Sequence, residues 1–313
     1  MAYTDAYYPP LNKISIAGKK ICFMRFVPQN RVQVLDHTNQ LMCGTLEDAA
    51  TDVTPGLRLY GYEVWIQPTV EELIHLLPYI GFTQDGSYFS VKQYGDLTSF
   101  ETIAHSQVQN EVYADCKVTK ATFTSQAGGA LILSLQVIAK TMTTNTDPFT
   151  ATGVADNTRP WIMSQATAIL NSLTVGFRQF TYAIDWNVQR AINNSETADD
   201  LDAVDLQQYV VLNMPYNPDR VSILNLALGS DRDDGIAGSV TFSRTLAQAQ
   251  QIVFTFDNLK RPEANTPSWL GKKAEMRDAA VYKVFANVIP STIITVANGS
   301  ISTTTTSTTT TGA

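Results

Sequence analysis

The stretch GYEVWIQPTVEELIHLL, residues 61–77, decides the expected fold, because it joins a strand to a capped helix. Aromatic and branched side chains alternate onto one face of the strand, at Tyr60, Tyr62, Val64 and Ile66. Thr69 and Glu72 then have the spacing of a capping box. In such a box the hydroxyl accepts a hydrogen bond from the N–H three residues on, and the carboxylate accepts one from the threonine N–H.

The helix that follows has one apolar face. Its apolar residues have the spacing i, i+3, i+4 and i+7, at Val70, Leu73, Ile74 and Leu77. Pro78 and Gly81 come next. Both residue types mark helix ends, so we expect the helix to stop there.

A similar pattern returns in GSVTFSRTLAQAQQIV, residues 238–253. A strand face is followed by Thr245 and Gln248, which have the spacing of a second capping box. A thinner helical stripe comes after it, at Leu246, Ala249 and Val253. The two units lie about half a chain apart, which suggests a duplicated domain. Because capping boxes are common, a chance recurrence explains the pair equally well.

Composition points to a soluble, mainly β protein. The 313 residues suffice for one large or two ordinary domains, and 13 Tyr and 13 Phe favour strands. The net charge of −7 provides no basic field to attract nucleic acid. The first residues lack the pattern of a secretory signal, and no apolar run is long enough to cross a bilayer.

The sequence offers no catalytic or metal-binding constellation. Cys22, Cys43 and Cys116 have no metal-ligand spacing, and we expect all three to be free buried thiols. The three histidines lie far apart, so neither a zinc site nor a Cys/His dyad can be assembled. Phosphate-binding, zincin and nucleophile-elbow motifs are absent. We therefore expect no enzyme activity and no cofactor.

Three further segments predict strands. Residues 112–118 alternate, with Cys116 on the buried face and Asp115, Lys117 and Thr119 pointing the other way. Residues 130–139 are almost continuously apolar, which predicts a strand covered on both faces. Residues 180–188 alternate over five apolar positions, the strongest strand pattern in the chain. Many short strands with few helices favour a sandwich or barrel.

A polar middle segment and two unusual ends suggest how the chain is divided. Residues 141–159 are turn-rich without an apolar period, as at a domain boundary. The N-terminus is rich in Tyr and Pro, which suits an extended arm or a frayed end. We expect an arm (1–13), a first domain (14–145), a linker (146–160), a second domain (161–298) and a Thr-rich tail (299–313).

Two acidic segments stand out. Residues 198–206 are expected to form a solvated loop or a short helix. The sequence DRDDG, residues 231–235, has carboxylates suited to calcium, but its glycine comes one place too early for an EF-hand and the final glutamate is missing. A solvated turn is the favoured interpretation.

Four stretches together resemble the tail tube proteins of long-tailed bacteriophages. They are the strand–helix unit at 57–77, NEVYADCKVTKATFTSQAGGALILSLQVIAK at 110–140, FTYAIDWNVQRA at 180–191 and GIAGSVTFSRTLAQAQQIVFTF at 235–256. The resemblance implies tandem β-sandwich or barrel-like domains with a flanking helix, which join edge to edge into a ring. Three duplicated chains or six single ones would complete the ring.

The resemblance also implies a function and partners. Rings stack into a hollow tail tube, through which double-stranded DNA passes without sequence-specific binding into the host. The other partners would be tail-tip initiator and terminator proteins, and the chain would assemble in the host bacterial cytoplasm and reside in the virion tail. Neither a membrane segment nor catalysis is implied.

Charge suggests which residues would face such a bore. Basic side chains would bind phosphates, whereas acidic ones would not. The candidates are Asp199, Asp200, Asp202, Asp205, Asp231, Asp233 and Asp234, with outer-surface loops as the equal alternative. Candidates for an arm that reaches the next ring are Tyr3, Tyr7 and Tyr8.

Two other functions stay open at the level of sequence. A tail-fibre or capsid-decoration module is the first, although the recurring strand–helix unit is longer than most fibre repeats. A carbohydrate-active β-sandwich enzyme is the second, and it would need an aromatic cleft with two suitably spaced carboxylates.

Overall fold

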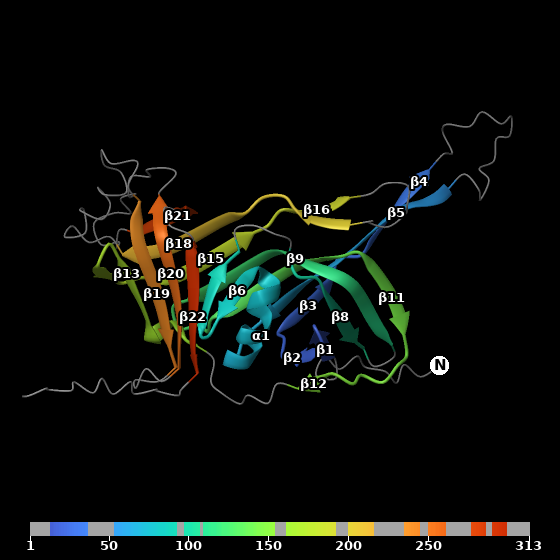
Figure 1. The fold of residues 1–313 in the computed structure, drawn as a ribbon, viewed down its shortest axis with the longest axis horizontal. Helices are drawn as coiled ribbons and strands as arrows, with labels where there is room; N and C mark the ends of the chain where they lie inside the picture. Colours follow the sequence, from blue (N-terminus) through green and yellow to red (C-terminus); the bar gives the residue numbers. More distant parts are fainter. Residues whose placement is uncertain are drawn as a thin grey trace, which may run out of the picture.

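The computed structural model describes residues 13–36, 53–92, 97–106, 109–153, 161–191, 200–215, 235–244, 250–260, 277–285 and 290–298. That part of the chain is mainly β, with one α-helix and one short 3-10 helix (Figure 1). The predicted β-rich fold is therefore confirmed.

The elements run from β1 to β22 in chain order. Up to residue 153 they are β1 (Lys13–Ile16), β2 (Lys19–Ile21), β3 (Arg25–Pro28), β4 (Arg31–Asp36), β5 (Val53–Ile66), α1 (Val70–Ile80), β6 (Phe82–Asp85), β7 (Tyr88–Val91), β8 (Phe100–His105), β9 (Asn110–Gln126), β10 (Ile132–Ala139), β11 (Thr141–Asn145) and β12 (Thr152–Gly153). Beyond it they are η3 (Met163–Gln165), β13 (Ala166–Leu170), β14 (Leu173–Val175), β15 (Gln179–Asp185), β16 (Val188–Ala191), β17 (Asp200–Ala203), β18 (Gln207–Pro215), β19 (Ile236–Ser243), β20 (Gln250–Lys260), β21 (Arg277–Phe285) and β22 (Thr292–Asn298).

The long strand β9 belongs to two sheets. Its residues 110–116 pair with β8 and β11, and its residues 117–126 pair with β10 and β15. Two irregularities mark the change: Asp115 has a φ of 50°, and the register with β10 skips Thr119. Such bulges bend a strand and increase its twist, which lets one strand serve both sheets.

These irregularities make the predicted alternation at 112–118 wrong in part. Cys116 is buried as expected, but so are Tyr113 and Lys117, whereas Val112 is only partly buried. Each irregularity shifts the side-chain period by one residue and turns the following residues to the other face.

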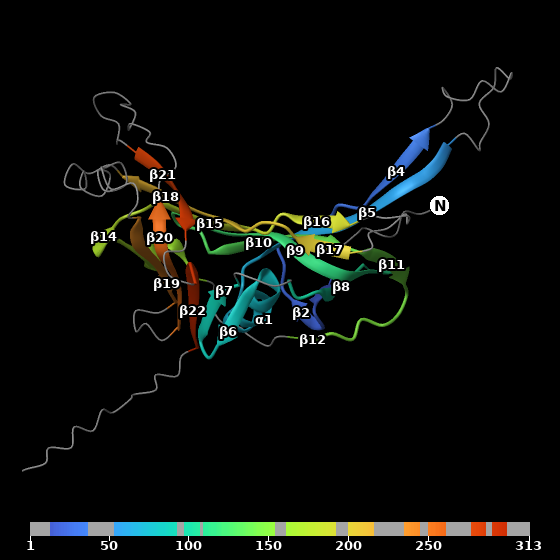
Figure 2. The same cartoon turned by 45° about the horizontal axis from the view of Figure 1, so that its top comes forward.

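The main sheet runs in the order β3–β5–β10–β9–β15–β18–β21, with all neighbours antiparallel. Strands from before and after the predicted linker thus lie in one sheet, joined by the β9–β15 pairing. Helix α1 and β6 lie on one side of this sheet, and the ribbon of β16 and β17 lies on the other (Figure 2). The hairpin of β4 and the first part of β5 projects away from the rest (Figures 1 and 2).

An aromatic cluster fills the core beneath β9 and β15. Phe254 contacts Phe123 at 5.1 Å and Phe180 at 5.2 Å between ring centroids, and Tyr182 lies 5.3 Å from Phe256. All five side chains are buried. The alternation predicted for 180–188 is confirmed, because Phe180, Tyr182, Ile184, Trp186 and Val188 are all buried.

The first strand–helix unit has both hydrogen bonds of its capping box. The Glu72 N–H donates to Thr69 Oγ1 at 3.3 Å, and the Thr69 N–H donates to Glu72 Oε2 at 3.0 Å. Pro78 does not end the helix, as the sequence had suggested, but lies inside its last turn. Gly81 ends it with a φ of 106°, a conformation that only glycine adopts without strain.

The second unit differs from the first. β19 and β20 form an antiparallel pair with Ser243 opposite Gln251, so residues 250–253, which were predicted to end a helix, are strand. Val253 pairs with Thr241. Thr245 and Gln248 lie outside the described residues.

Candidate functional surface

One face of the main sheet is covered by the core. The opposite face carries the β16–β17 ribbon over one part and is otherwise open (Figure 2). Along β10 the burial alternates strictly at residues 132–139, so the expectation of a strand covered on both faces is wrong for a single chain. A buried row crosses the sheet at Val64, Leu135, Ala121, Ile184 and Gln208. Because a strand alternates with period two, burial of this row fixes which residues face outward.

The outward-facing residues define what we call the open face. One row is Glu63, Gln136, Lys120, Asp185 and Gln207. The next is Arg25, Trp65, Ser134, Thr122, Ala183, Tyr209 and Lys283. A third is Ile132, Thr124, Thr181 and Val211. Hydroxyl and amide side chains predominate over charged ones in these rows.

Several charged groups of the open face are engaged with neighbours on the same face. Lys120 Nζ lies 3.9 Å from Asp185 Oδ2, with both side chains more than a third exposed. Glu63 Oε1 accepts hydrogen bonds from Trp65 Nε1 at 2.6 Å and from Ser134 Oγ at 3.2 Å. Exposed pairs of this kind add little stability, but they neutralise the local field.

A buried polar network holds the sheet beneath the open face. Gln208 Oε1 accepts from Tyr182 OH and from Thr292 Oγ1, each at 2.7 Å, and Gln208 Nε2 donates to Ser291 Oγ at 2.9 Å. The network links β15 and β18 to the start of β22. Because its side-chain amide is bonded through both of its polar atoms, Gln208 can be buried without a large desolvation cost.

Three of the acidic bore candidates, Asp200, Asp202 and Asp205, lie within the described residues. Asp200 and Asp202 are exposed on β17, which pairs with β16. The loop or short helix expected at 198–206 is therefore wrong for residues 200–203, which form a strand. Asp205 lies at the margin of the open face, where its Oδ2 accepts from Gln207 Nε2 at 2.8 Å. Outside the described residues lie Asp199, Asp231, Asp233, Asp234, Tyr3, Tyr7 and Tyr8.

Sequence reasoning missed the open face, although its signal was present. Thr181, Ala183 and Asp185 separate the buried residues of β15, so the same alternation that predicted the core also defined the outward side chains. To place these side chains beside Thr122 and Ser134, one must know the order and register of the strands. Both depend on contacts between residues far apart in the chain.

The cysteines differ from one another. Cys116 is buried, and that burial raises the pKa of its thiol to about 12. Cys22 is exposed, which corrects the expectation of three buried thiols, and Cys43 lies outside the described residues.

Among the described residues, no cluster of three or more His, Cys, Asp or Glu side chains is arranged to hold a metal ion. No helix in the same part of the chain is long and apolar enough to cross a membrane.

Comparison with known proteins agrees with the resemblance seen in the sequence. The family model described as phage tail tube protein matches residues 34–271, more than half of the chain. A search of curated proteins finds no match. The family match runs through both predicted domains and the segment between them. The chain therefore belongs to the phage tail tube protein family.

Proposed function

We propose that copies of this chain join edge to edge into rings, that the rings stack into a tube, and that the open face lines the bore. Membership of the family makes the chain a structural component of the phage tail. The observation that carries the proposal further is the continuous antiparallel sheet, with one face packed on the core and the other presenting more hydroxyl and amide side chains than charged ones.

The edges of the sheet suit ring formation. Among the described residues, β3 pairs only with β5, and the second side of β21 is used only at residues 283–285, by β20. An unpaired strand edge is a template for another chain. We infer that β3 of one copy meets the edge beside β21 of the next.

Both predicted domains, 14–145 and 161–298, supply strands to this sheet. We therefore favour three chains per ring, which would give pseudo-sixfold symmetry, over six. The projecting β4–β5 hairpin offers a contact to the next ring. Tail-tip initiator and terminator proteins would meet the two ends of the tube, after assembly in the host cytoplasm.

A polar bore with few charges suits passage of DNA. Duplex DNA carries a dense array of phosphates, and each unpaired lysine or arginine that meets them adds a salt-dependent attraction that slows sliding. Hydroxyl and amide groups stay hydrated and form no ion pairs with the phosphates. We propose that the tube conducts double-stranded DNA into the host and performs no catalysis.

Electron microscopy of the purified protein at rising concentration, together with light scattering, tests this proposal. We expect hollow rings or tubes whose end views have threefold or pseudo-sixfold symmetry. A compact trimer that never stacks would instead favour a fibre or decoration protein.

A further inference from the structure

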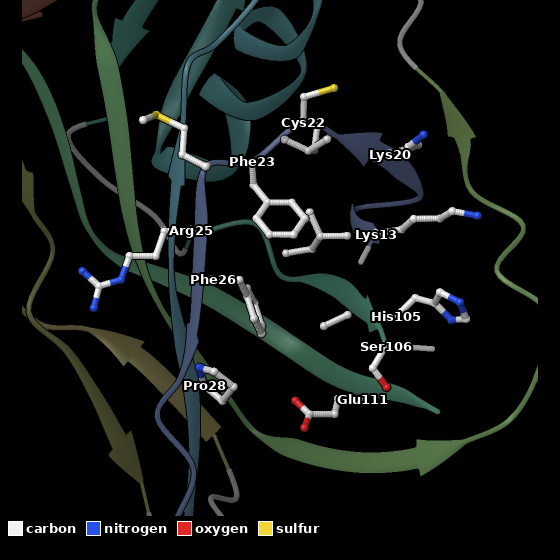
Figure 3. A pocket seen from close by; sticks show the side chains of 14 residues that line it. Lys13, Lys20, Cys22, Phe23, Arg25, Phe26, Pro28, His105, Ser106 and Glu111 are labelled. Atoms are coloured by element: carbon white, nitrogen blue, oxygen red, sulfur yellow. The ribbon is translucent and has the colours of Figure 1, made fainter. Parts of the chain in front are cut away.

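A groove of about 730 Å³ opens beside the first strands, and of its lining residues only Arg25 also belongs to the open face. Its lining comes from β1, β2, β3 and the residues between β2 and β3, and from the end of β8 and the start of β9. Phe23 and Phe26 point into it, whereas Arg25 points away on the other side of β3 (Figure 3). That volume lies in the range of sites that bind several side chains or a small ligand.

The floor of the groove is aromatic and held by the core. Phe26 packs against Tyr62 at 5.1 Å and Tyr113 at 6.4 Å between ring centroids, and Phe23 meets Phe26 edge-on at 6.5 Å. Both phenylalanines are only half-buried, so part of each ring faces the groove. A floor supported in this way is formed before a ligand binds, which lowers the entropic cost of binding.

The rim of the groove is basic. Lys13 and Lys20 both line it and are exposed. Glu111 also lines it, but its carboxylate accepts a hydrogen bond from Tyr113 OH at 2.7 Å, and this bond draws it toward the core. A matching ligand combines aromatic or proline side chains with an acidic group.

Residues 1–12 of the chain, MAYTDAYYPPLN, have this chemistry. They contain three tyrosines, two prolines and Asp5, with no Lys or Arg. Proline-rich extended segments bind aromatic grooves well because little conformational freedom is left to lose. The other terminus, 299–313, has one large apolar residue and no acidic side chain, so it cannot fill an aromatic floor.

The position of Lys13 indicates which copy supplies the segment. Residues 1–12 join the chain at Lys13, on the rim itself. Only the four residues 9–12 separate Tyr8 from Lys13. Two prolines, Pro9 and Pro10, restrict how sharply so short a link can turn back, which favours the groove of a neighbouring copy over the chain's own. We propose that the N-terminal segment of one copy binds the groove of a neighbouring copy. This inference rests on the proposed function only in that assembly brings the copies together.

Binding of a labelled synthetic peptide of residues 1–12 to the full chain, kept dilute, tests the inference by fluorescence anisotropy. We expect saturable binding that weakens about tenfold or more in Phe23→Ala, since truncating an aromatic anchor has effects of this size. Lys20→Glu should weaken binding and remove part of its salt dependence. Tyr88→Ala, which removes an exposed aromatic outside the groove, should bind as the wild type does.

The outcomes separate this inference from the proposed function. A peptide that fails to bind, or that binds the Phe23→Ala and Tyr88→Ala variants equally, overturns the groove assignment even if tubes form. Binding that is seen only when Tyr7 and Tyr8 of the chain are replaced by alanine shows that its own arm fills the groove, and it overturns the exchange between copies. With the inference correct, excess peptide competes with the N-terminal segments of neighbouring copies and reduces the assembly that light scattering measures.

Discussion

Gly81 and Trp186 meet where helix α1 ends above the main sheet. The Trp186 indole donates from Nε1 to the carbonyl of Ile80 at 2.7 Å, so the ring lies against the C-terminus of the helix. A Cβ at position 81 would come within 2.7 Å of Trp186 Cε2. The glycine is therefore required both for its positive φ and for the approach of the ring.

We predict that Gly81→Ala lowers the free energy of unfolding by about 2–4 kcal/mol, combining left-handed strain with overpacking. Gly86→Ala is the matched control, because Gly86 has a φ of 62° but no atom within 4 Å of the added Cβ. It should cost only about 1–2 kcal/mol. Urea unfolding measures both, and equal losses would show that the contact with Trp186 does not matter.

Cys116 should make stability fall at alkaline pH. Burial raises its pKa from 9.0 to about 12, so the folded state keeps the thiol proton where the unfolded chain releases it. The contribution is complete below pH 9 and is lost as the pH rises toward 12. Between about pH 9 and 10, Cys116→Ala should flatten the slope by up to ~1.4 kcal/mol per pH unit, because the tyrosines titrate alike in both proteins. Urea titrations at a series of pH values measure it; an unchanged slope contradicts the assignment.

At the scale of elements, Glu72 connects the helix to the first strands. Its carboxylate accepts from the Thr69 N–H at 3.0 Å and from the Cys22 N–H at 2.8 Å, and the side chain is 1% exposed. The helix cap thus also orders the segment that leads into the groove.

We predict that Glu72→Ala lowers the free energy of unfolding by about 2–3 kcal/mol, because two backbone donors lose their acceptor. Thr69→Ala should cost about 1 kcal/mol, a typical value for a lost cap. Glu71→Gln, an exposed change in the same turn, should stay within about 0.5 kcal/mol. Thermal and urea unfolding test the order Glu72, Thr69, Glu71, and a different order would contradict the geometry.

The β16–β17 ribbon is held to the sheet by two cationic side chains, the buried Lys117 and the half-buried Arg190. Lys117 Nζ donates to the carbonyl of Leu201, and Arg190 Nη2 donates to the carbonyl of Tyr60 at 2.8 Å. Burial lowers the pKa of Arg190, because the charged guanidinium loses part of its hydration there. We predict that Lys117→Met speeds amide hydrogen exchange in β16 and β17 more than tenfold while β10 is unchanged. Lys120→Met, on the open face, should leave amide hydrogen exchange in β16 and β17 unchanged. Equal effects of the two substitutions would refute the role of Lys117.

Local patterns were predictable from the sequence, and features set by distant contacts were not. The cap at Thr69 and the alternation from Phe180 depend on neighbours in the chain. Around Asp115 the side chains of β9 change the side of the sheet they face, because β9 pairs with two different sheets. Val253 lies in a strand because β19 and β22 pair with β20 on its two sides. The helical stripe that the sequence extends to Val253 therefore gives way to strand pairing at that residue.

For the whole molecule, the proposed conduit requires an open face on which polar side chains outnumber charged ones. We predict that Thr122→Lys combined with Thr181→Lys preserves ring formation, because both side chains point away from the core. Tubes of this variant should retain duplex DNA at low salt and release it steeply as salt rises. Glu71→Lys, on the exposed side of α1, adds charge without this retention. Filter binding across a salt series measures it, and equal DNA retention by both variants would place the open face outside the bore.

The most direct test is a cryo-electron microscopy map of the assembled tube. We predict that Thr122, Ser134 and Thr181 line the bore, that α1 lies on the outer side of the sheet, and that β3 of one copy adjoins β21 of the next. A tube whose bore is lined by α1, with the open face turned outward or buried between rings, would contradict it.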